Sequence, residues 1–563
     1  MKKQARWRDW GLHFGLLMLA LLVGWVHRRT LVMFFGPDDI IHLEQASGLI
    51  PASTSPLRFL SQVAYFRAVL DFSGPYAPTF HLLSLLLHMI NVVLVGLLAR
   101  GLGLARASSL LAAGLFGLHP LVTPSLMYAV NINELMALAG FLVAVRLARS
   151  GNRVLNAIAP VALLGALFSK ESVLLLPALA PALLKSPGAV RGARTGWLLL
   201  VAPTVAFATL FGVLALWGLI PRGDAYDVSV GPVTLANIGT YLRWLFDLGH
   251  PVPDAIGAPD MRAWPVAIMG LFAFGLAHYL FRGARRVLDV GAGWFILGGL
   301  PTFVLAHHSY AAYLYMPGVG LGIGLAAIFE GAIQRVTSWM REPQAARAGH
   351  TSTTARLVPV ALGLLLLFAF AARSNALLRT RALARLRVVD LPSDPLARKS
   401  VIAGRAVSSM ATALPPNART AVLFAPATSK LEVSTLSGRL STSGGMRPSY
   451  DLQATVLDKG RAFRLFFPQL DSVVFVDSLS KIDESCAVFS RSNEGYLGFH
   501  GMGVAGAWNL SDRLAAAGYT EDARAIAAML ADGGADSTGA RAGRESPELT
   551  RSTVSGQGHP KAR

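Results

Sequence analysis

The sequence is poor in charge and poorer still in cysteine. Only 15% of its 563 residues are Asp, Glu, Lys or Arg, while 53% are hydrophobic. A soluble globular chain needs more charge than this to cover its surface, so the composition excludes an ordinary soluble protein. The single cysteine, Cys486, excludes an intramolecular disulfide and a cysteine-based metal cluster. The chain is therefore predicted to be a polytopic membrane protein.

Acidic residues are scarce relative to basic ones, 32 against 51, which gives a formal charge of +19. A nucleic-acid-binding protein would gather this excess on one polar face, whereas here short clusters of Lys and Arg separate apolar segments. The basic residues therefore indicate membrane topology, and no nucleic-acid partner is expected.

The chain also lacks a signal-peptide cleavage site and an internal repeat. A basic start precedes the apolar run from about Leu12 to Val26, but no small-x-small site follows, so an uncleaved first spanning helix is expected. A secondary transporter would show inverted repeats with broken helices near mid-membrane, and no such symmetry is found. That class is the least favoured.

Apolar segments of about 20 residues, the length that crosses a bilayer, recur through the first 373 residues. About eleven are predicted, near residues 11–27, 79–99, 107–127, 133–149, 154–169, 171–185, 196–220, 264–281, 292–306, 312–333 and 356–373. If the N-terminus is cytoplasmic, each inner loop carries the Lys and Arg excess that the positive-inside rule requires. The C-terminal part of the chain is then predicted to be periplasmic.

Two of the outer loops are long, about 28–78 and 221–263. Both mix charged residues with large apolar ones, as in the stretch from Tyr241 to Phe246, a composition typical of helices that lie in the membrane interface. We expect these loops to cover a cavity at the membrane surface.

The composition changes after the last apolar segment. Short apolar runs at 421–424, 463–467 and 473–476 predict strands, and a helix is predicted from Thr520 to about Ala531. The predicted fold is thus an all-α polytopic membrane domain over residues 1–373, followed by a small mixed α/β periplasmic domain over 374–531. Residues 532–563 contain almost no large apolar side chain, so we predict a disordered tail.

Two adjacent carboxylates, Asp38 and Asp39, follow the first apolar segment directly. A carboxylate at a membrane surface can accept a proton from an attacking hydroxyl if it lies within hydrogen-bond reach. The structural alternative is that the pair caps a helix that starts after Pro37.

The second apolar segment carries His81, Ser84, His88 and Asn91 at spacings that share one helix face. Polar residues on one face of a spanning helix either bond to neighbouring helices or line a cavity, and hydrogen bonding between helices is the favoured interpretation.

Further polar residues gather at the predicted outer ends of later segments. They are His119 in the stretch Gly117-Leu118-His119-Pro120, then Glu134, the pair Lys170 and Glu171, and finally His307, His308 and Tyr313. The Lys-Glu pair could be a neutralised turn or a contact for phosphate. Tyr313 could be a membrane anchor, since Tyr is enriched at the interface. His307 and His308 make no metal site without a third ligand.

Taken in order, these motifs resemble those of the multi-spanning glycosyltransferases that use polyprenyl-phosphate sugars. This superfamily includes the protein O-mannosyltransferases and the lipid A aminoarabinose transferase. The resemblance is closest to the bacterial branch related to the transmembrane-and-tetratricopeptide mannosyltransferases, without their repeats, and covers about residues 10–335. It is carried by Asp38-Asp39, Phe80-His81 through Asn91, Gly117 to Pro120, Ser169-Lys170-Glu171 with Pro177, and Tyr313 to Gly320.

The resemblance implies transfer of a sugar, with inversion, from a polyprenyl-phosphate donor to a hydroxyl of a lipid, glycan or protein. The reaction would take place on the periplasmic face of the bacterial inner membrane, with Asp38 or Asp39 as the base. The candidates to hold the donor phosphate would be Lys170, His119, Glu171 and His81. The cavity or acceptor site would be lined by His42, Glu134, His307, His308 and Tyr313.

The partners expected are this lipid-linked donor, the acceptor and membrane lipids, and no resident cofactor is assigned. The need for a divalent cation stays open, because the outer acidic residues are too scattered to define ligand spacing. Some positions depart from the family pattern, such as Ala311-Ala312 where a Glu-Arg pair is usual. The alternative is therefore a non-catalytic membrane protein of the same fold that binds a polyprenyl lipid or assists envelope assembly.

Overall fold

The computed structural model of the chain describes residues 2–52, 55–150, 152–184, 193–219, 227–246, 259–341, 353–383, 390–392, 395–424, 460–475, 482–492 and 495–532. The tail predicted for 532–563 lies outside this set apart from Asp532. Parts of the second long loop also lie outside it.

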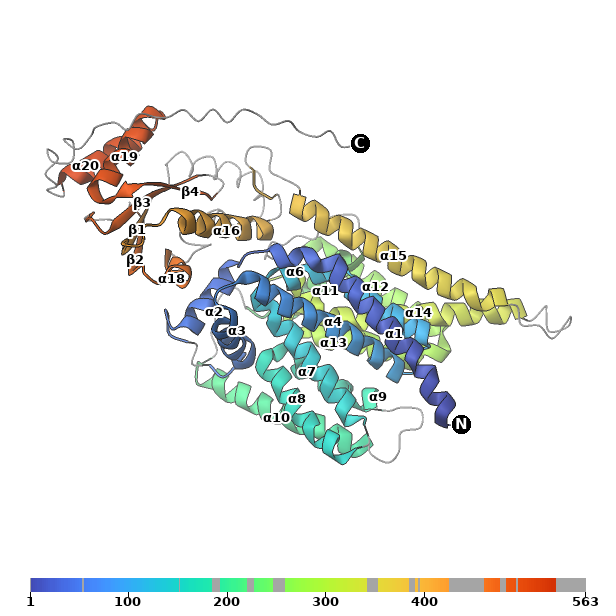
Figure 1. Ribbon diagram of the computed structural model, residues 1–563. Helices are drawn as coiled ribbons and strands as arrows, with labels where there is room; N and C mark the ends of the chain where they lie inside the picture. The colour runs from blue at the N-terminus through green and yellow to red at the C-terminus, as the bar shows by residue number, and fades with distance from the viewer. Residues whose placement is uncertain are drawn as a thin grey trace, which may run out of the picture.

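The first part of the chain is helical (Figure 1). In order, its described elements are α1 (Lys2–His27), η1 (Arg28–Val32), α2 (Pro37–Ser47), the π-helical turn η2 (Phe59–Ala64), α3 (Tyr65–Ser73), α4 (Ala77–Gly101), α5 (Arg106–Gly117), η3 (Pro120–Val122), α6 (Thr123–Met127), η4 (Ala129–Asn131), α7 (Ile132–Ala148), α8 (Arg153–Ser169), η5 (Glu171–Leu179), α9 (Ala180–Leu184), α10 (Ala193–Leu216), α11 (Pro232–Phe246), η7 (Met261–Ala263), α12 (Trp264–Leu280), η8 (Arg282–Ala284), α13 (Arg285–Phe303), η9 (Ala311–Leu314), α14 (Tyr315–Arg341) and α15 (Thr353–Leu383).

The prediction of a mostly helical protein is confirmed, and its long apolar helices are consistent with a polytopic membrane protein. Seven described helical segments are long and apolar enough to cross a membrane, and the bent pair formed by α5 with η3 and α6 adds an eighth. Helices also form at the predicted spans 154–169, 171–185 and 292–306, although these do not meet the same criterion. Leu271 and Phe272 of α12 remain 74% and 73% exposed, as expected for side chains that face lipid.

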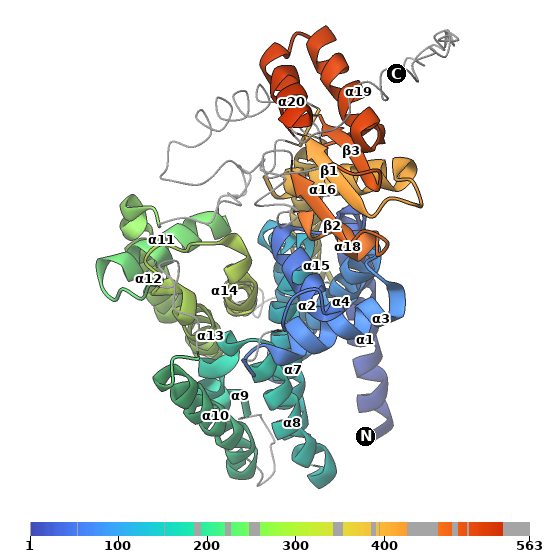
Figure 2. The ribbon, with the colours of Figure 1, turned by 90° about the vertical axis from the view of Figure 1, so that its left-hand side faces the viewer.

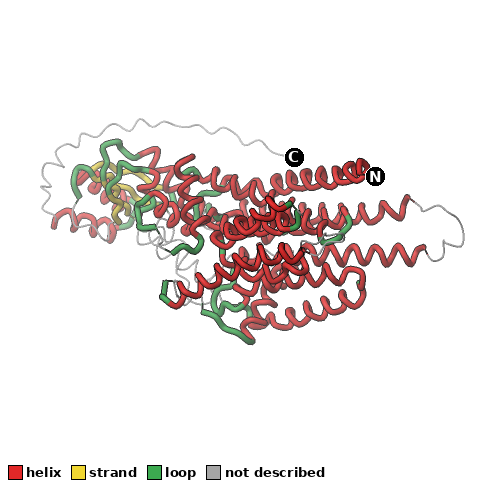
Figure 3. Tube along the Cα trace, turned by 90° about the horizontal axis from the view of Figure 1, so that it is seen from below, coloured by secondary structure: helices red, strands yellow, loops and turns green. Residues whose placement is uncertain are grey.

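The helices run side by side, with the strands gathered at one end (Figure 3). The N-terminus of α1 lies at the opposite end from the sheet (Figure 2). Loops predicted to be cytoplasmic contact one another: an Arg149 Nη donates to the carbonyl of Gly101 at 2.6 Å, and an Arg286 Nη donates to that of Ala182 at 2.9 Å. We call the end that carries the sheet the sheet end.

A bent segment lies at the centre of the bundle. Every residue from Leu111 to Ala129 is buried, and the chain bends by 48° between α5 and η3. The bend releases backbone carbonyls that lipid cannot satisfy. The Gly117 carbonyl lies 3.2 Å from Nε2 of both His27 and His88. The Ser374 hydroxyl donates to the Leu118 carbonyl.

The polar face of α4 therefore makes hydrogen bonds within the bundle. His88 Nδ1 lies 2.9 Å from the hydroxyl of Tyr315, which also accepts a 3.0 Å bond from the Asn91 amide. The same amide donates to the Leu135 carbonyl at 3.0 Å. These contacts agree with the interpretation favoured from the sequence, in which the polar face of this helix bonds to neighbouring helices.

Replacing His88 tests this structural role. His88→Leu should lower the free energy of unfolding by about 0.5–2 kcal/mol, because the Gly117 carbonyl and the Tyr315 hydroxyl each lose a partner. Thermal unfolding in detergent measures the change. The control Leu86→Ala removes a side chain on the same helix that is 44% exposed and should shift the midpoint little; an equal shift in both variants would contradict the assignment.

The rest of the described chain forms α16 (Pro395–Ala413), β1 (Thr420–Phe424), α18 (Phe463–Phe466), β2 (Ser472–Phe475), β3 (Cys486–Arg491), β4 (Leu497–Met502), α19 (Gly503–Ala516) and α20 (Thr520–Asp532). We call residues 395–532 the C-terminal region. The sheet has the order β2-β1-β3-β4, with β1 parallel to both neighbours and β4 antiparallel to β3.

Alternating side chains of β1 contact different layers. Val422 packs in a cluster with Leu510 of α19 and Ile526 of α20, whereas Leu423 belongs to the cluster that holds Ile402 of α16. The helix α15 continues past residue 373 to Leu383, so the predicted end of the membrane domain falls inside a helix.

The strand predicted at 463–467 is wrong, because this segment forms the short helix α18. Apolar runs of this length do not distinguish a strand from one helical turn. Here the helical turn stacks the rings of Phe463 and Phe467 and brings Phe466 onto Phe34, 5.5 Å between ring centroids. The runs at 421–424 and 473–475 lie in β1 and β2.

Candidate functional site

The two adjacent carboxylates have different surroundings. Asp39 is fully buried at the first turn of α2, where its Oδ2 accepts the Gly36 N–H at 2.8 Å and its Oδ1 accepts the Val130 N–H at 2.7 Å. Asp39 thus caps α2 and joins it to the end of the bent segment. Gly36 permits this contact, since a Cβ there would lie 1.8 Å from the Tyr128 ring.

Burial raises the pKa of Asp39 to about 7, against the lowering effect of the backbone N–H groups of Gly36, Val130 and Ala129. The folded chain therefore binds this proton more tightly than the unfolded chain, whose carboxyl titrates near 3.8. The associated stability is fully present below about pH 4 and is lost as pH rises through about 7.

This linkage predicts that the unfolding midpoint of the wild type falls between pH 4 and pH 8 more steeply than that of Asp39→Asn, in which this position does not titrate. The difference between the two proteins isolates Asp39, because every other side chain is the same in both. Equal pH slopes over this interval would contradict the assignment.

Asp38, one residue earlier, is exposed. The basic side chains within electrostatic range of it include His42 on the next turn of α2, His308 from the loop before η9, and Lys399 from α16. Burial lowers the pKa of His42, whose ring packs on Phe66 and whose Nδ1 lies 3.1 Å from the Gln45 side-chain oxygen.

Lys170 lies between α8 and η5 with an extended backbone, and its side chain is almost fully buried. The ammonium donates to Glu134 Oε1 at 2.6 Å and lies 5.3 Å from the centre of the Tyr313 ring. Ser172 lies 3.4 Å from the second Glu134 oxygen. A Lys ammonium has three N–H donors, and Glu134 takes one.

Glu171 forms an ion pair with Arg58 of the first outer loop. The Arg58 Nε donates to Oε2 at 2.8 Å, and Nη2 contacts Oε1, so the pair is bidentate. Ser61 also donates to the Ser169 carbonyl at 2.7 Å. The first outer loop therefore holds the backbone on both sides of Lys170.

Arg58 was not identified from the sequence. It has φ of 58°, in the left-handed region that few non-glycine residues adopt, directly before the π-helical turn η2. Strained backbone of this kind is maintained by its surroundings, here by the bidentate contact with Glu171. No local sequence pattern predicts that Arg58 pairs with Glu171, which lies 113 residues away in the chain.

His308 links the two parts of the site. Its ring stacks on Tyr313 at 5.7 Å, and it lies within electrostatic range of both Asp38 and Lys170. Burial lowers the pKa of His308. The neighbouring His307 is exposed in the same loop. The structure thus gives Asp38 and Lys170 a common neighbour in His308, although the three residues are far apart in the chain.

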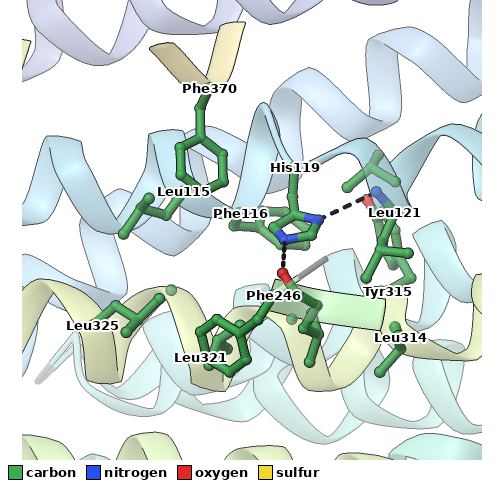
Figure 4. Close-up of a pocket in the computed structure, with 14 residues that line it drawn as sticks. Leu115, Phe116, His119, Leu121, Phe246, Leu314, Tyr315, Leu321, Leu325 and Phe370 are labelled. Atoms are coloured by element: carbon green, nitrogen blue, oxygen red, sulfur yellow. Dashed lines mark hydrogen bonds between the residues drawn. The ribbon is translucent and has the colours of Figure 1, made fainter. Parts of the chain in front are cut away.

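His119 and His81 bond to backbone. His119 Nε2 lies 3.0 Å from the Leu245 carbonyl, and Nδ1 accepts the Leu121 N–H at 3.2 Å, so both ring nitrogens are engaged (Figure 4). The ring borders a small apolar cavity of about 60 Å³ between α5, α11, α14 and α15. His81 Nδ1 lies 3.2 Å from the Leu126 carbonyl. Both residues hold the bent segment in place.

The described ranges contain no group of three or more His, Cys, Asp or Glu side chains arranged to hold a metal ion. Asp39, Glu134 and Glu171 instead contact different partners, and Asp38 is exposed.

Comparison with known proteins gives few relatives. No family model matches the chain, and no curated protein matches it. Among solved structures, it is similar to the archaeal oligosaccharyltransferase AglB from Archaeoglobus fulgidus in complex with an inhibitory peptide and a dolichol-phosphate, with 12% identity and a TM-score of 0.38. The match covers 66% of this chain and 56% of that chain, so it spans little more than half of AglB. At that TM-score the likeness identifies neither a family nor an activity.

Proposed function

We propose that the protein is a membrane glycosyltransferase that moves a sugar from a polyprenyl-phosphate donor to a hydroxyl acceptor at the sheet end of the bundle. The observation that carries this proposal is that His308 lies in electrostatic range of both the exposed carboxylate of Asp38 and the buried ammonium of Lys170. A base and a cation that share a neighbour at one end of a membrane bundle suit a reaction between a lipid-borne phosphate ester and a hydroxyl.

The proposed step is a single displacement. The acceptor oxygen attacks the anomeric carbon, the bond from that carbon to the phosphate oxygen breaks, and polyprenyl phosphate leaves with both electrons. Asp38 takes the proton of the acceptor hydroxyl. The configuration at the anomeric carbon inverts, because the acceptor attacks from the face opposite the leaving phosphate.

Lys170 is the proposed contact for the departing phosphate, since Glu134 takes one N–H and no other acceptor of the described residues takes the remaining two. Tyr313, whose ring centre lies 5.3 Å from the ammonium, and His308, stacked on that ring, would limit access of water. Arg58 and Glu171 position Lys170 by fixing the backbone around it. Asp39, His81 and His119 hold the helices that carry these groups.

We place the site on the periplasmic side of a bacterial inner membrane, with the N-terminus of α1 in the cytoplasm. The Lys and Arg excess of the loops at the opposite end supports this orientation. The first 383 residues would form the membrane domain, and the C-terminal region would lie in the periplasm.

The test is turnover by the full chain in nanodiscs made from native lipid extract, which supplies acceptors. A labelled polyprenyl-phosphate hexose is added, and both products are quantified. The proposal predicts equal amounts of polyprenyl phosphate and glycosylated acceptor. Saturable binding of the labelled donor without either product would instead support the non-catalytic, lipid-binding alternative.

A further inference from the structure

The C-terminal region contacts the chain immediately before Asp38. The Ser400 hydroxyl of α16 accepts the Phe34 N–H at 2.7 Å and donates to the Phe34 carbonyl at 3.1 Å, so it satisfies both backbone groups of one residue. Gly404, one turn later, allows close approach, since a Cβ there would lie 3.3 Å from Phe34. Phe466 packs on both Phe34 and Phe35.

A second set of contacts fixes the start of α16. Ala397 is 3% exposed and packs in a small apolar cluster with Met127 and Tyr128 of the bent segment, bordered by Met33. The backbone on both sides of Lys399 is therefore held against the segment that leads into α2. This docking places Lys399 next to the segment that leads into α2.

Lys399 is a partly buried cation at this junction. No carboxylate of the described residues lies within ion-pair distance of its ammonium, although Asp38 lies within electrostatic range. Burial lowers the pKa of Lys399, and Asp38 raises it. An ammonium that is partly desolvated without a direct partner is stabilised when an anion binds beside it.

Lys399 and Lys170 come from different elements, α16 and the junction of α8 with η5. Asp38 acts electrostatically on Lys399 directly, whereas it shares only the neighbour His308 with Lys170. If Lys170 binds the donor phosphate and Asp38 takes the proton of the acceptor hydroxyl, Lys399, the lysine in range of Asp38, is a candidate contact for the acceptor.

We propose that Lys399 binds an oxyanion of the acceptor, so that the C-terminal region completes the site and selects acceptors that carry a phosphate or a carboxylate near the accepting hydroxyl. The identification of the bound anion as part of the acceptor rests on the proposed function. The binding of an oxyanion by Lys399 stands independently of that function.

The first experiment compares two products of the full chain in native-lipid nanodiscs: labelled hexose on the acceptor, and free hexose released when water replaces the acceptor. Lys399→Met should reduce transfer about 10- to 100-fold, the effect of losing one charge-assisted contact. It should change the release of free hexose and the donor KM by less than about twofold, and Lys399→Arg should restore part of the transfer.

Arg405→Met is the matched control, because it removes another cation of α16, one that pairs with Asp390 and lies over the Tyr496 ring. It should leave the ratio of the two products unchanged. A parallel fall of transfer and free-hexose release in Lys399→Met, or a raised donor KM, would assign Lys399 to the donor or to folding and overturn the proposal. Unchanged transfer would also overturn it.

The second experiment needs no turnover. Lysines of the full chain are reductively methylated with 13C-formaldehyde, and the Lys399 signal is assigned by its absence in Lys399→Arg. Inorganic phosphate should shift this signal saturably, whereas sodium chloride at equal ionic strength should not. A linear shift, or equal shifts with both salts, would overturn oxyanion binding even if the wild type transfers sugar; a saturable shift in a wild type without turnover would reject the proposed function alone.

Discussion

Asp38→Asn is expected to reduce sugar transfer by about 10²- to 10⁴-fold while the protein keeps its unfolding midpoint. The fall is the loss expected when a general base is removed. Stability should be retained because Asp38 is exposed and makes no hydrogen bond within the described part of the chain. The measurement is the initial rate of transfer from a labelled polyprenyl-phosphate hexose, with the midpoint recorded on the same preparation.

Asp39→Asn is the matched comparison, since it makes the same chemical change one residue later. An amide offers only one oxygen to the two N–H groups of Gly36 and Val130, so this variant should lose stability. Its transfer rate per folded molecule should fall far less than that of Asp38→Asn. The opposite pattern, with Asp38→Asn fully active and Asp39→Asn folded but inactive, would assign the base to Asp39.

Lys170→Met should have the largest effect on stability, because it leaves the buried carboxylate of Glu134 without its cation. Breaking a buried pair on one side costs about 3–5 kcal/mol. Transfer should also be lost, since Lys170 is the proposed phosphate contact. Chemical unfolding in detergent and the transfer assay give the two quantities.

The double variant Lys170→Met with Glu134→Leu separates structure from function. Removing both charges should restore most of the lost stability, because an apolar pair of similar size is often no less stable than a buried ion pair. Transfer should stay lost. The exposed pair of Arg67 and Asp71 provides the control, where Asp71→Asn should cost at most about 1 kcal/mol. A double variant that regained transfer would remove Lys170 from the mechanism.

The arrangement of helices could be predicted largely from the sequence, because the length and apolarity of a spanning segment are local properties. The bend at Gly117 was not predicted, since it depends on His27, His88 and Ser374, which supply hydrogen bonds to the released carbonyls. The short apolar runs of the C-terminal region were harder to interpret, and the run at 463–467 was assigned the wrong structure.

The candidate site was predicted only as a set of residue types. The sequence placed Asp38 and Asp39 together but could not distinguish them, because the difference arises from the Val130 N–H, 91 residues away. The phosphate role of His119 was expected from the resemblance alone, and one sequence could not show that both ring nitrogens bond to backbone. The contributions of Arg58 and Lys399 result from contacts between distant segments, which no local pattern in one sequence reveals.

The most direct test of the central claim is the anomeric configuration of the product formed by the reconstituted wild-type protein from a donor of known configuration. Nuclear magnetic resonance of the isolated product, with polyprenyl phosphate quantified in the same reaction, gives both stereochemistry and stoichiometry. The account predicts an inverted linkage and one polyprenyl phosphate released per sugar transferred, with neither product above background in Asp38→Asn. A retained linkage, or undiminished transfer by Asp38→Asn, would contradict a single displacement that uses Asp38 as its base.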